Sequence, residues 1–191
     1  MTTTGAVARR EQILATAAEL FAERGFHGVS VADLGAACGI SGPALYKHFG
    51  SKDAVLAEML VAISEELLAE GRQRVGSADD AADAVRRLVD FHVDFALGRP
   101  ALIVVQDRDW ASLPDDARER VRGLQRAYVD LWAAQLRTVD PGLDLDASRA
   151  AAHATFGLLN STPHSARVPA ERMRGLLAGM ALRSLGADSA T

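Results

Sequence analysis

Side chains that can donate hydrogen bonds to phosphate oxygens gather in one short segment near the N-terminus. Tyr46, Lys47 and His48 are consecutive, and Lys52 follows them; Lys47 and Lys52 are the two lysines of the chain. Small residues at 42–44 precede this group, so the backbone there can approach another molecule closely. Contacts to phosphate position a protein on nucleic acid. The segment therefore predicts a surface that binds a phosphate backbone, against the alternative of an ordinary solvated helix face.

The elements around this segment predict how it is positioned. The apolar spacing of residues 31–38 is that of a short helix, which Ser30 can cap at its start and Gly39 can end. Ser41 can cap the next helix, over residues 42–49, in the same way. Gly39 also allows a positive φ in the turn between the two helices. Two short helices joined by a tight turn have the spacing of a helix-turn-helix.

The rest of the chain also shows helical patterns. Segments between glycine and proline breaks have helical length, and β-branched alternation is nearly absent. Helices are expected over residues 8–24, 31–38, 42–49, 52–74, 79–97, 100–111, 115–138, 146–160 and 170–185. We predict an all-α chain of about nine helices, with a head over residues 1–51 and a helical body over residues 52–191. The first seven residues are expected to be disordered.

Composition and charge narrow the class of protein. The 191 residues are 49% hydrophobic and 24% charged, which is typical of a globular chain. The net charge is −4, but residues 1–52 carry five basic against four acidic side chains, whereas residues 53–191 carry sixteen against twenty-one. Apolar runs are too short to cross a bilayer, and the N-terminus lacks the apolar core of a signal peptide. Cys38 is the one cysteine, which excludes an intramolecular disulfide and a cysteine-based zinc site. A cytoplasmic protein is expected.

The head resembles the TetR-type bacterial transcriptional regulators. The resemblance rests on F-A-E-R-G-F-H-G-V-S-V at Phe21–Val31 and on D-L-G-A-A-C-G-I-S-G-P-A-L-Y-K-H-F-G-S-K-D-A-V-L at Asp33–Leu56. The close match covers about residues 9–58. The resemblance implies that the head is a helix-turn-helix DNA-binding domain and that the body binds a ligand and dimerises through its last two helices. Cys38, where alanine is usual, is expected to be a buried core residue.

What the resemblance implies about DNA contact agrees with the donors described above. It implies that the start of the second helix lies near phosphate, that the third helix meets DNA, and that the first helix begins with a basic arm. The predicted DNA-binding residues are Arg9, Arg10, Ser30, Val31, Ser41, Gly42, Pro43, Ala44, Tyr46, Lys47, His48 and Lys52. Sequence choice is expected from residues 42–47, and affinity from the surrounding donors.

Aromatic and polar side chains in the body predict a site for a small molecule. The set is Phe91, His92, Phe95, Gln106, Arg108, Trp110, Tyr128, Trp132, Phe156 and Asn160. Aromatic side chains mixed with a few convergent polar groups are typical of ligand pockets, and core packing is the alternative for each aromatic alone. For Arg108 the alternatives are an ion pair with a neighbouring acid and a clamp for an anionic ligand.

The segment from Arg108 to Trp132 resembles actinobacterial regulators linked to fatty-acid or steroid catabolism, some of which sense acyl-CoA thioesters. The resemblance implies a small effector that is apolar or amphipathic. Its acyl chain would lie beside the aromatic side chains, and its phosphates beside Arg108 or beside Arg118, Arg120, Arg122 and Arg126. A solvated helix face is the alternative for these four arginines.

The last predicted helix carries an apolar stripe with a spacing of three and four residues. Together with the helix before it, and with the resemblance, this stripe predicts a homodimer interface. The predicted interface residues are His153, Phe156, Leu159, Met173, Leu176, Leu177 and Met180. Burial within one subunit is the alternative.

The sequence contains no recognisable catalytic or metal-binding pattern. No two of the five histidines are three or four residues apart, as a helical metal site would require, and no Gly-x-Ser-x-Gly motif occurs. We therefore expect neither an enzyme nor a cofactor or metal. The predicted function is a sequence-specific DNA-binding transcriptional repressor that binds a near-palindromic operator as a homodimer and is released by an effector in the body. The alternative is a DNA-binding regulator without a small-molecule effector, controlled by a protein partner or by abundance.

Overall fold

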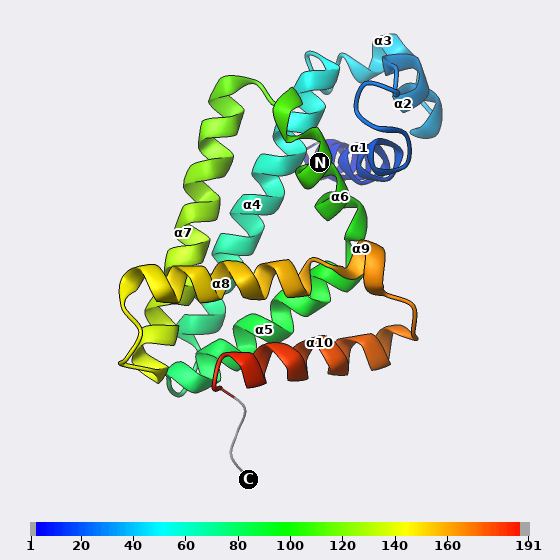
Figure 1. Cartoon of the computed structure of the whole chain (residues 1–191). Helices are drawn as coiled ribbons and strands as arrows, with labels where there is room; N and C mark the ends of the chain where they lie inside the picture. The colour runs from blue at the N-terminus through cyan, green and yellow to red at the C-terminus, as the bar shows by residue number, and fades with distance from the viewer. Residues whose placement is uncertain (1–2, 188–191) are drawn as a thin grey trace. The chain divides into compact units, whose positions relative to one another are not determined.

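Every regular element of the computed structural model is a helix (Figure 1). The structure describes residues 3–187, and within that range it contains ten α-helices, one 3-10 helix and no strand. The all-α prediction is confirmed. The nine predicted helices are present, and the tenth is the four-residue α9 (Thr162–Ser165), which forms in a break that separates two predicted helices.

Contacts within the chain group the residues into two compact units. Among the described residues, the first unit contains residues 3–63 together with 101–121, and the second contains 64–100 together with 122–187. Nearly all of α6 (Pro100–Asp109) thus belongs with the N-terminal helices, although we expected it in the body. The domain boundary after residue 51 stays a prediction.

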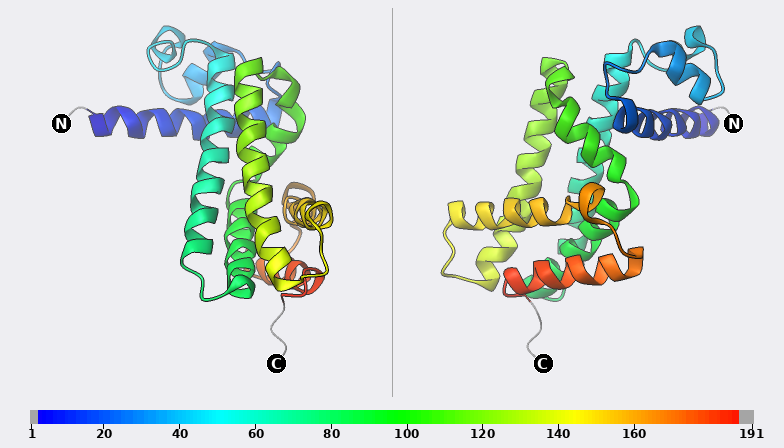
Figure 2. Two further views of the ribbon diagram at one scale, coloured as in Figure 1. Left: turned by 90° about the vertical axis from the view of Figure 1, so that its left-hand side faces the viewer. Right: turned by 45° about the vertical axis from the view of Figure 1, so that its right-hand side comes forward.

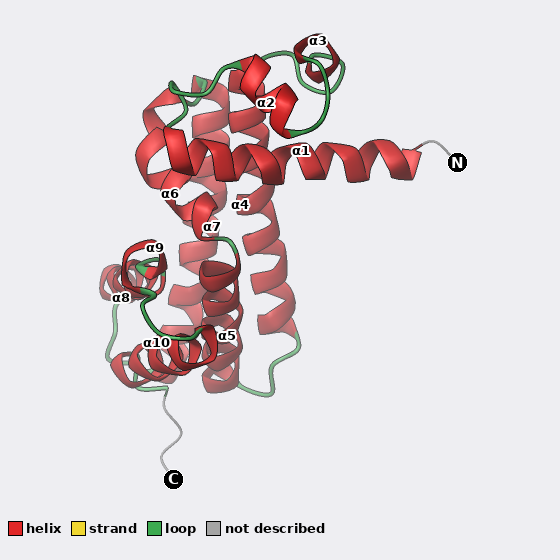
Figure 3. Cartoon of the chain, turned by 90° about the vertical axis from the view of Figure 1, so that its right-hand side faces the viewer, coloured by secondary structure: helices red, strands yellow, loops and turns green. Residues whose placement is uncertain are grey.

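The first unit is built from three N-terminal helices and parts of later ones (Figure 3). These are α1 (Thr3–Arg24), α2 (Val31–Ala37) and α3 (Gly42–Leu45). The later elements are the first half of α4 (Lys52–Gly76), nearly all of α6, the 3-10 helix η1 (Trp110–Ser112) and the start of α7 (Asp115–Val139) up to residue 121. α1 begins at Thr3, so the disorder expected for residues 3–7 is wrong. That segment has no proline, and one interior glycine costs a helix only about 1 kcal/mol. Met1 and Thr2 lie outside the described residues.

Side-chain caps and tight turns set the ends of the short helices. The Ser30 hydroxyl accepts from the Asp33 amide at 3.1 Å, and the Asp33 carboxylate accepts from the Ser30 amide at 2.8 Å, which completes a capping box at the start of α2. α3 ends at Leu45, four residues earlier than predicted. The reason is that the Lys47 and His48 amides donate to carbonyls three residues back, at 3.2 and 2.9 Å, which tightens the chain beyond an α-helix.

An apolar core joins the helices of the first unit. Five side chains that a helix-turn-helix would bury are at most 3% exposed: Phe21, Phe26, Leu34, Leu45 and Phe49. Burying a side chain of this size contributes about 1.5–3 kcal/mol. Cys38 is buried as expected, and burial raises the pKa of its thiol.

The second unit combines α5 (Ala81–Gly98), α8 (Leu145–Leu159) and α10 (Ala170–Ser184) with the later parts of α4 and α7 (Asp115–Val139). α10 packs along α5, and α8 contacts both helices (Figure 2). The core of this unit surrounds Trp132, whose side chain is 0% exposed. Apolar burial therefore holds these helices together.

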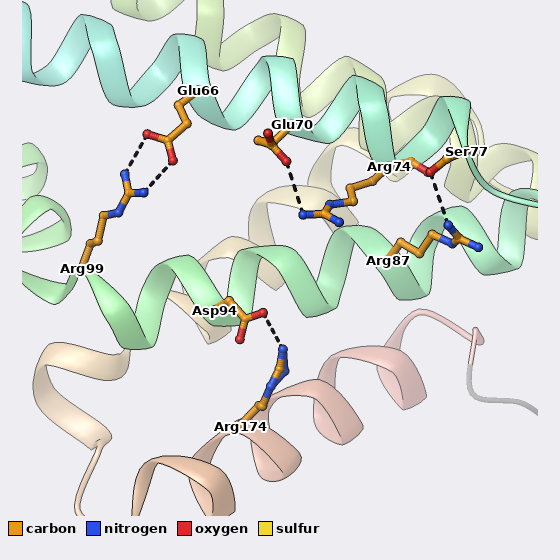
Figure 4. A network of polar contacts seen from close by, with 8 residues as sticks. All are labelled: Glu66, Glu70, Arg74, Ser77, Arg87, Asp94, Arg99 and Arg174. Atoms are coloured by element: carbon orange, nitrogen blue, oxygen red, sulfur yellow. Dashed lines mark hydrogen bonds and ion pairs between the residues drawn. The ribbon is translucent and has the colours of Figure 1, made fainter. Parts of the chain in front are cut away.

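Ion pairs join neighbouring helices of the second unit at its surface (Figure 4). Arg99, at the end of α5, donates to both carboxylate oxygens of Glu66 on α4, at 2.6 and 2.8 Å. Arg174 on α10 donates to Asp94 on α5 at 2.5 Å. Exposed pairs of this kind contribute about 0–1 kcal/mol each.

None of the helices in the described range is long and apolar enough to cross a membrane.

Candidate nucleic-acid interface

α2 and α3 approach each other until their backbones touch. Gly39 has φ +66° and forms the turn between them, as predicted. A Cβ on Gly35 would lie 2.8 Å from the carbonyl oxygen of Ile40 and 3.0 Å from the amide nitrogen of Gly42. A glycine is therefore required at position 35 for this helix angle. Gly35 is not among the predicted site residues. A glycine inside a short helix, four residues before the turn glycine Gly39, was the signal in the sequence that could have identified it.

The start of α3 and the residues after it present polar groups to solvent. The Ser41 hydroxyl caps α3 by accepting from the Ala44 amide at 3.3 Å, and Pro43 lies in the first turn. Tyr46 is 54% exposed, and Lys47 is exposed without a partner among the described residues. The Tyr46 hydroxyl and the Lys47 ammonium are donors that phosphate oxygens and base edges accept. His48, by contrast, is half-buried.

The start of α2 lies against the start of α3. A Cβ on Gly42 would be 3.9 Å from the Cγ1 methyl of Val31, so these two predicted contact residues are neighbours. Ser30 is exposed, and its hydroxyl is also engaged by the Asp33 carboxylate at 2.5 Å. Hydrogen bonding to Ser30 lowers the pKa of Asp33. The structure thus brings Ser30, Val31 and the α3 residues onto one part of the first unit.

Arg10 binds other parts of the protein. Its guanidinium donates to both carboxylate oxygens of Glu58 and to the carbonyl oxygen of His48, and it lies 4.1 Å from the centre of the Phe49 ring. The hydrogen bonds to Glu58 raise the pKa of Arg10. Because these contacts join α1, α4 and the end of the helix-turn-helix, Arg10 holds the head together. Glu58 was not predicted, since a half-buried acid on a helix gives no signal in the sequence.

Lys52 and Arg9 also bind backbone carbonyl groups within the first unit. The Lys52 ammonium donates to the carbonyl oxygens of Phe26 and Val29, both at 2.8 Å, and lies 4.2 Å from the centre of the Phe26 ring. The Arg9 guanidinium donates to the carbonyl oxygen of Cys38 at 2.6 Å. Two of the three ammonium hydrogens of Lys52 are thereby used. Both side chains support the turns that flank α2.

The end of α6 contacts the end of α1 within the first unit. The Arg108 guanidinium donates to the carbonyl oxygen of Ala22 at 3.0 Å and to that of Phe21, and it pairs with Asp109 at 3.1 Å. Asp109 is buried, and its carboxylate accepts from the Phe26 amide at 3.3 Å. Of the two interpretations of Arg108, the ion pair with a neighbouring acid is the one that the structure contains.

Six of the ten residues predicted for the ligand site meet in the second unit: His92, Phe95, Tyr128, Trp132, Phe156 and Asn160. We call these six residues the aromatic cluster. The Phe156 ring stacks on His92 at 4.9 Å and on Tyr128 at 5.4 Å between ring centres, and Trp132 meets it edge-on at 5.0 Å. Phe91 packs against Arg74 at 5.4 Å, and the first unit contains Gln106, Arg108 and Trp110.

Burial sets the protonation state of the aromatic cluster. It lowers the pKa of His92 to about 4 and raises the pKa of the Tyr128 phenol, so both are neutral near pH 7. His92 Nε2 lies 3.0 Å from Asn160 Oδ1, and Nδ1 lies 3.3 Å from the Tyr128 hydroxyl. With the carbonyl oxygen of Asn160 as acceptor, Nε2 carries the proton and Nδ1 accepts from Tyr128. The indole N–H of Trp132 is buried near Tyr128 but does not reach normal hydrogen-bond geometry.

The predicted dimer residues divide by exposure. Leu176 and Met180 on α10 are each 47% exposed, and His153 on α8 is exposed. The core of the second unit buries Leu159, Met173 and Leu177, and Phe156 belongs to the aromatic cluster. We call His153, Leu176 and Met180 the exposed stripe.

Within the described residues, no three potential metal ligands gather in one place.

Comparisons with known proteins agree with a DNA-binding head and a helical body. Residues 13–59 match the family "Bacterial regulatory proteins, tetR family", and residues 78–164 match "Tetracyclin repressor-like, C-terminal domain". The HTH-type transcriptional repressor KstR2 of Mycobacterium tuberculosis is 37% identical over 145 residues, which is 72% of each chain. KstR2 of Rhodococcus jostii is 30% identical over 135 residues, which is 70% of this chain and 66% of that protein.

Solved structures share the fold. A TetR-family regulator from Bordetella parapertussis has a TM-score of 0.80 at 24% identity, with 91% of this chain and 93% of that chain covered. AibR, solved in complex with isovaleryl coenzyme A and operator DNA, has a TM-score of 0.71 at 21% identity, with 90% and 97% covered. The identity to KstR2, together with the two family matches, shows that the chain belongs to the TetR family of bacterial regulatory proteins.

Proposed function

We propose that this chain is a cytoplasmic transcriptional repressor that binds a near-palindromic operator as a homodimer and leaves it when a small effector binds. The observation that carries the proposal is the exposed group after α3, where Tyr46 and Lys47 project from a helix pair in backbone contact. The family and its transcriptional regulators support this class of function and argue against an enzyme.

The proposed DNA contacts follow the exposed residues. Residues 42–47 enter the major groove and read base edges, while Tyr46 and Lys47 also reach phosphates. Ser30 and Val31 approach the backbone from the start of α2. Residues 1–51 form the DNA-binding domain in this proposal, and residues 52–191 form the ligand-binding and dimerisation domain.

A second copy of the chain is proposed to cover the exposed stripe. An isologous interface would place Leu176 and Met180 of one copy against the same face of the other. The exposure of two large apolar side chains on one helix supports this arrangement, because such side chains gain by being removed from water. The dimer would set its two α3 helices about 34–36 Å apart, in successive major grooves.

The effector is proposed to be small and apolar or amphipathic, and to bind at the aromatic cluster. The faces of Tyr128, Trp132 and Phe156 suit an apolar group, and His92 with Asn160 offers polar atoms. The complex of AibR with isovaleryl coenzyme A supports an acyl thioester as the class to test first. A coupling of about 1–3 kcal/mol between effector and operator would change operator affinity about 5–150-fold.

Two observations on the aromatic cluster favour the alternative of a regulator without a small-molecule effector. Trp132 is 0% exposed, and the polar atoms of His92 are bonded within the cluster. Mass spectrometry of the native protein, with calorimetry against acyl-CoA thioesters of graded chain length, separates the two candidates. Binding that Trp132→Ala weakens, while DNA affinity stays unchanged, supports an effector site; no binding of any thioester supports the alternative.

The DNA-binding proposal is tested by selection of random-sequence double-stranded DNA on the purified chain. We expect enrichment of a near-palindromic site, which we call the selected operator. Lys47→Ala should weaken its binding because an exposed cation next to the groove is lost. No enriched sequence, or an unchanged affinity in Lys47→Ala, would contradict the proposal or this contact, respectively.

A further inference from the structure

The turn between α1 and α2, residues 25–29, is held from two sides by helices that lead into the second unit. Asp109, at the end of α6, accepts from the amide of Phe26 at 3.3 Å. Lys52, at the start of α4, donates to the carbonyl oxygen of the same Phe26 at 2.8 Å. One residue of this turn therefore has its amide fixed by α6 and its carbonyl fixed by α4.

Arg108 closes the end of α1 beside this turn. The last carbonyl groups of a helix lack partners within it and carry partial negative charge. The Arg108 guanidinium donates to the carbonyl oxygens of Phe21 and Ala22. It also lies 3.9 Å from where a Cβ on Gly25 would be, and Gly25, with φ +79°, is the residue that ends α1. The position of the α1 end is thereby tied to the last turn of α6.

Asp109 and Arg108 depend on each other. The Asp109 side chain is 7% exposed and forms an ion pair with Arg108 at 3.1 Å. A buried charge is tolerated when its partners are in place, and removing one partner leaves the other uncompensated. His27 adds a contact from the same turn, since its Nε2 lies 3.1 Å from the Ser112 hydroxyl of η1. The end of α6 and Ser112, the last residue of η1, thus form a polar latch on residues 25–29.

The latch acts at the entry to the helix-turn-helix. Ser30, which begins the capping box of α2, directly follows the held turn. α2 in turn meets α3 at backbone contact through Gly35, which leaves no slack between the two helices. A displacement of residues 25–29 therefore moves α2 and α3 together.

We propose that Arg108 and Asp109 are positioning residues for DNA binding: they hold the α1–α2 turn to the end of α6, so that the placement of α6 sets the orientation of the helix-turn-helix on DNA. The inference rests on the proposed function of α3. It assigns Arg108 to the DNA-binding unit, through a contact with the protein backbone, and gives α6 a route to the head that is separate from the α4 anchor at Lys52.

The test compares Arg108→Ala with Arg137→Ala in the full chain. Arg137 is an exposed arginine in the last turn of α7, in the second unit, so its removal changes the net charge equally. Affinity for the selected operator is measured across a range of salt concentrations. We expect a loss of about tenfold in Arg108→Ala and none in Arg137→Ala.

The salt dependence separates positioning from contact with DNA. A side chain that neutralises phosphate contributes about −0.9 to the slope of log K against log salt concentration, counted once for each subunit. Arg108→Ala should lower the affinity without changing the slope, whereas Lys47→Ala should make the slope of a dimer shallower by about two. A shallower slope in Arg108→Ala would show that Arg108 meets phosphate and would overturn the inference.

Asp109→Asn provides a milder variant in case Arg108→Ala does not fold. It keeps the size of the side chain and an oxygen acceptor but removes the charge that faces Arg108. Hydrogen exchange should be faster at the Phe26 amide in this variant, and operator affinity should fall with an unchanged slope. A folded Asp109→Asn variant with wild-type hydrogen exchange at the Phe26 amide and wild-type operator affinity would overturn this inference. It would leave the proposed function unaffected. A wild-type chain that selects no operator would refute the proposed function, and the inference with it.

Discussion

Gly71 on α4 is the position where one added methyl group should report most directly on the packing of the second unit. A Cβ there would lie 2.7 Å from Cε2 of Tyr128 and 3.0 Å from Cδ2 of Leu131. The Tyr128 ring cannot retreat easily, because it is buried, stacks on Phe156 at 5.4 Å and hydrogen-bonds to His92. Gly71→Ala therefore forces the ring of Tyr128 or the backbone of α4 to shift.

Two opposing contributions set the change in stability that Gly71→Ala should cause. Alanine is favoured over glycine inside a helix by about 1 kcal/mol, and overpacking a well-filled core costs about 1–3 kcal/mol. Gly123→Ala on α7 is the matched control, because nothing lies within 4 Å of its Cβ and only the helix term applies. We expect Gly71→Ala to be less stable than Gly123→Ala by about 2 kcal/mol, or by about 4–8 °C in Tm.

Urea unfolding followed by circular dichroism measures this difference at one fixed protein concentration, since the stability of the proposed dimer would depend on concentration. Removing the ring with Tyr128→Leu should relieve the clash, so that Gly71→Ala costs less in that background than in the wild type. Equal stability of Gly71→Ala and Gly123→Ala would refute the close approach of α4 and α7 at Tyr128.

Three further predictions test individual groups. Stability should be highest above pH 6.5 and fall by up to about 3 kcal/mol as the pH drops toward 4, because the buried, neutral His92 has a lowered pKa and the unfolded chain binds its proton more readily; His92→Gln should lack this component in pH-dependent unfolding. Lys52→Met should destabilise the chain by about 1–3 kcal/mol in urea, because the carbonyl groups of Phe26 and Val29 lose their donor; normal stability with lost DNA affinity would instead make Lys52 a DNA contact. Leu176→Glu should convert a dimer into monomers in sedimentation experiments, because a charge enters the exposed stripe, and an unchanged mass would place the interface elsewhere.

Much of the helix layout could be predicted because its signals are local. Ser30 and Ser41 cap the helices that they precede, and Gly39 adopts the positive φ that its position in the turn requires. The core side chains Phe21 and Leu34 follow helical spacing and are buried. These features depend on neighbouring residues only, so one sequence is sufficient to predict them.

The partners of the basic side chains could not be predicted, because they come from distant parts of the chain. Arg10 meets Glu58 across 48 positions, and Arg108 meets Ala22 across 86. The residues next to an arginine or lysine in the sequence do not distinguish among its possible partners, which include DNA phosphate, a carboxylate and the end of another helix. From the sequence, Arg10 and Lys52 are therefore predicted to contact DNA. In the structure, the Arg10 guanidinium binds Glu58 and the Lys52 ammonium binds the carbonyl oxygen of Phe26.

Protection of the selected operator from chemical modification tests the central claim, that α3 reads DNA, most directly. Dimethyl sulfate methylates guanine N7 in the major groove, and hydroxyl radicals report contacts along the backbone. The account predicts major-groove protection in two half-sites about one helical turn apart, which Lys47→Ala weakens without moving it. Protection confined to the minor groove, or a single half-site contacted by a monomer, would contradict the account.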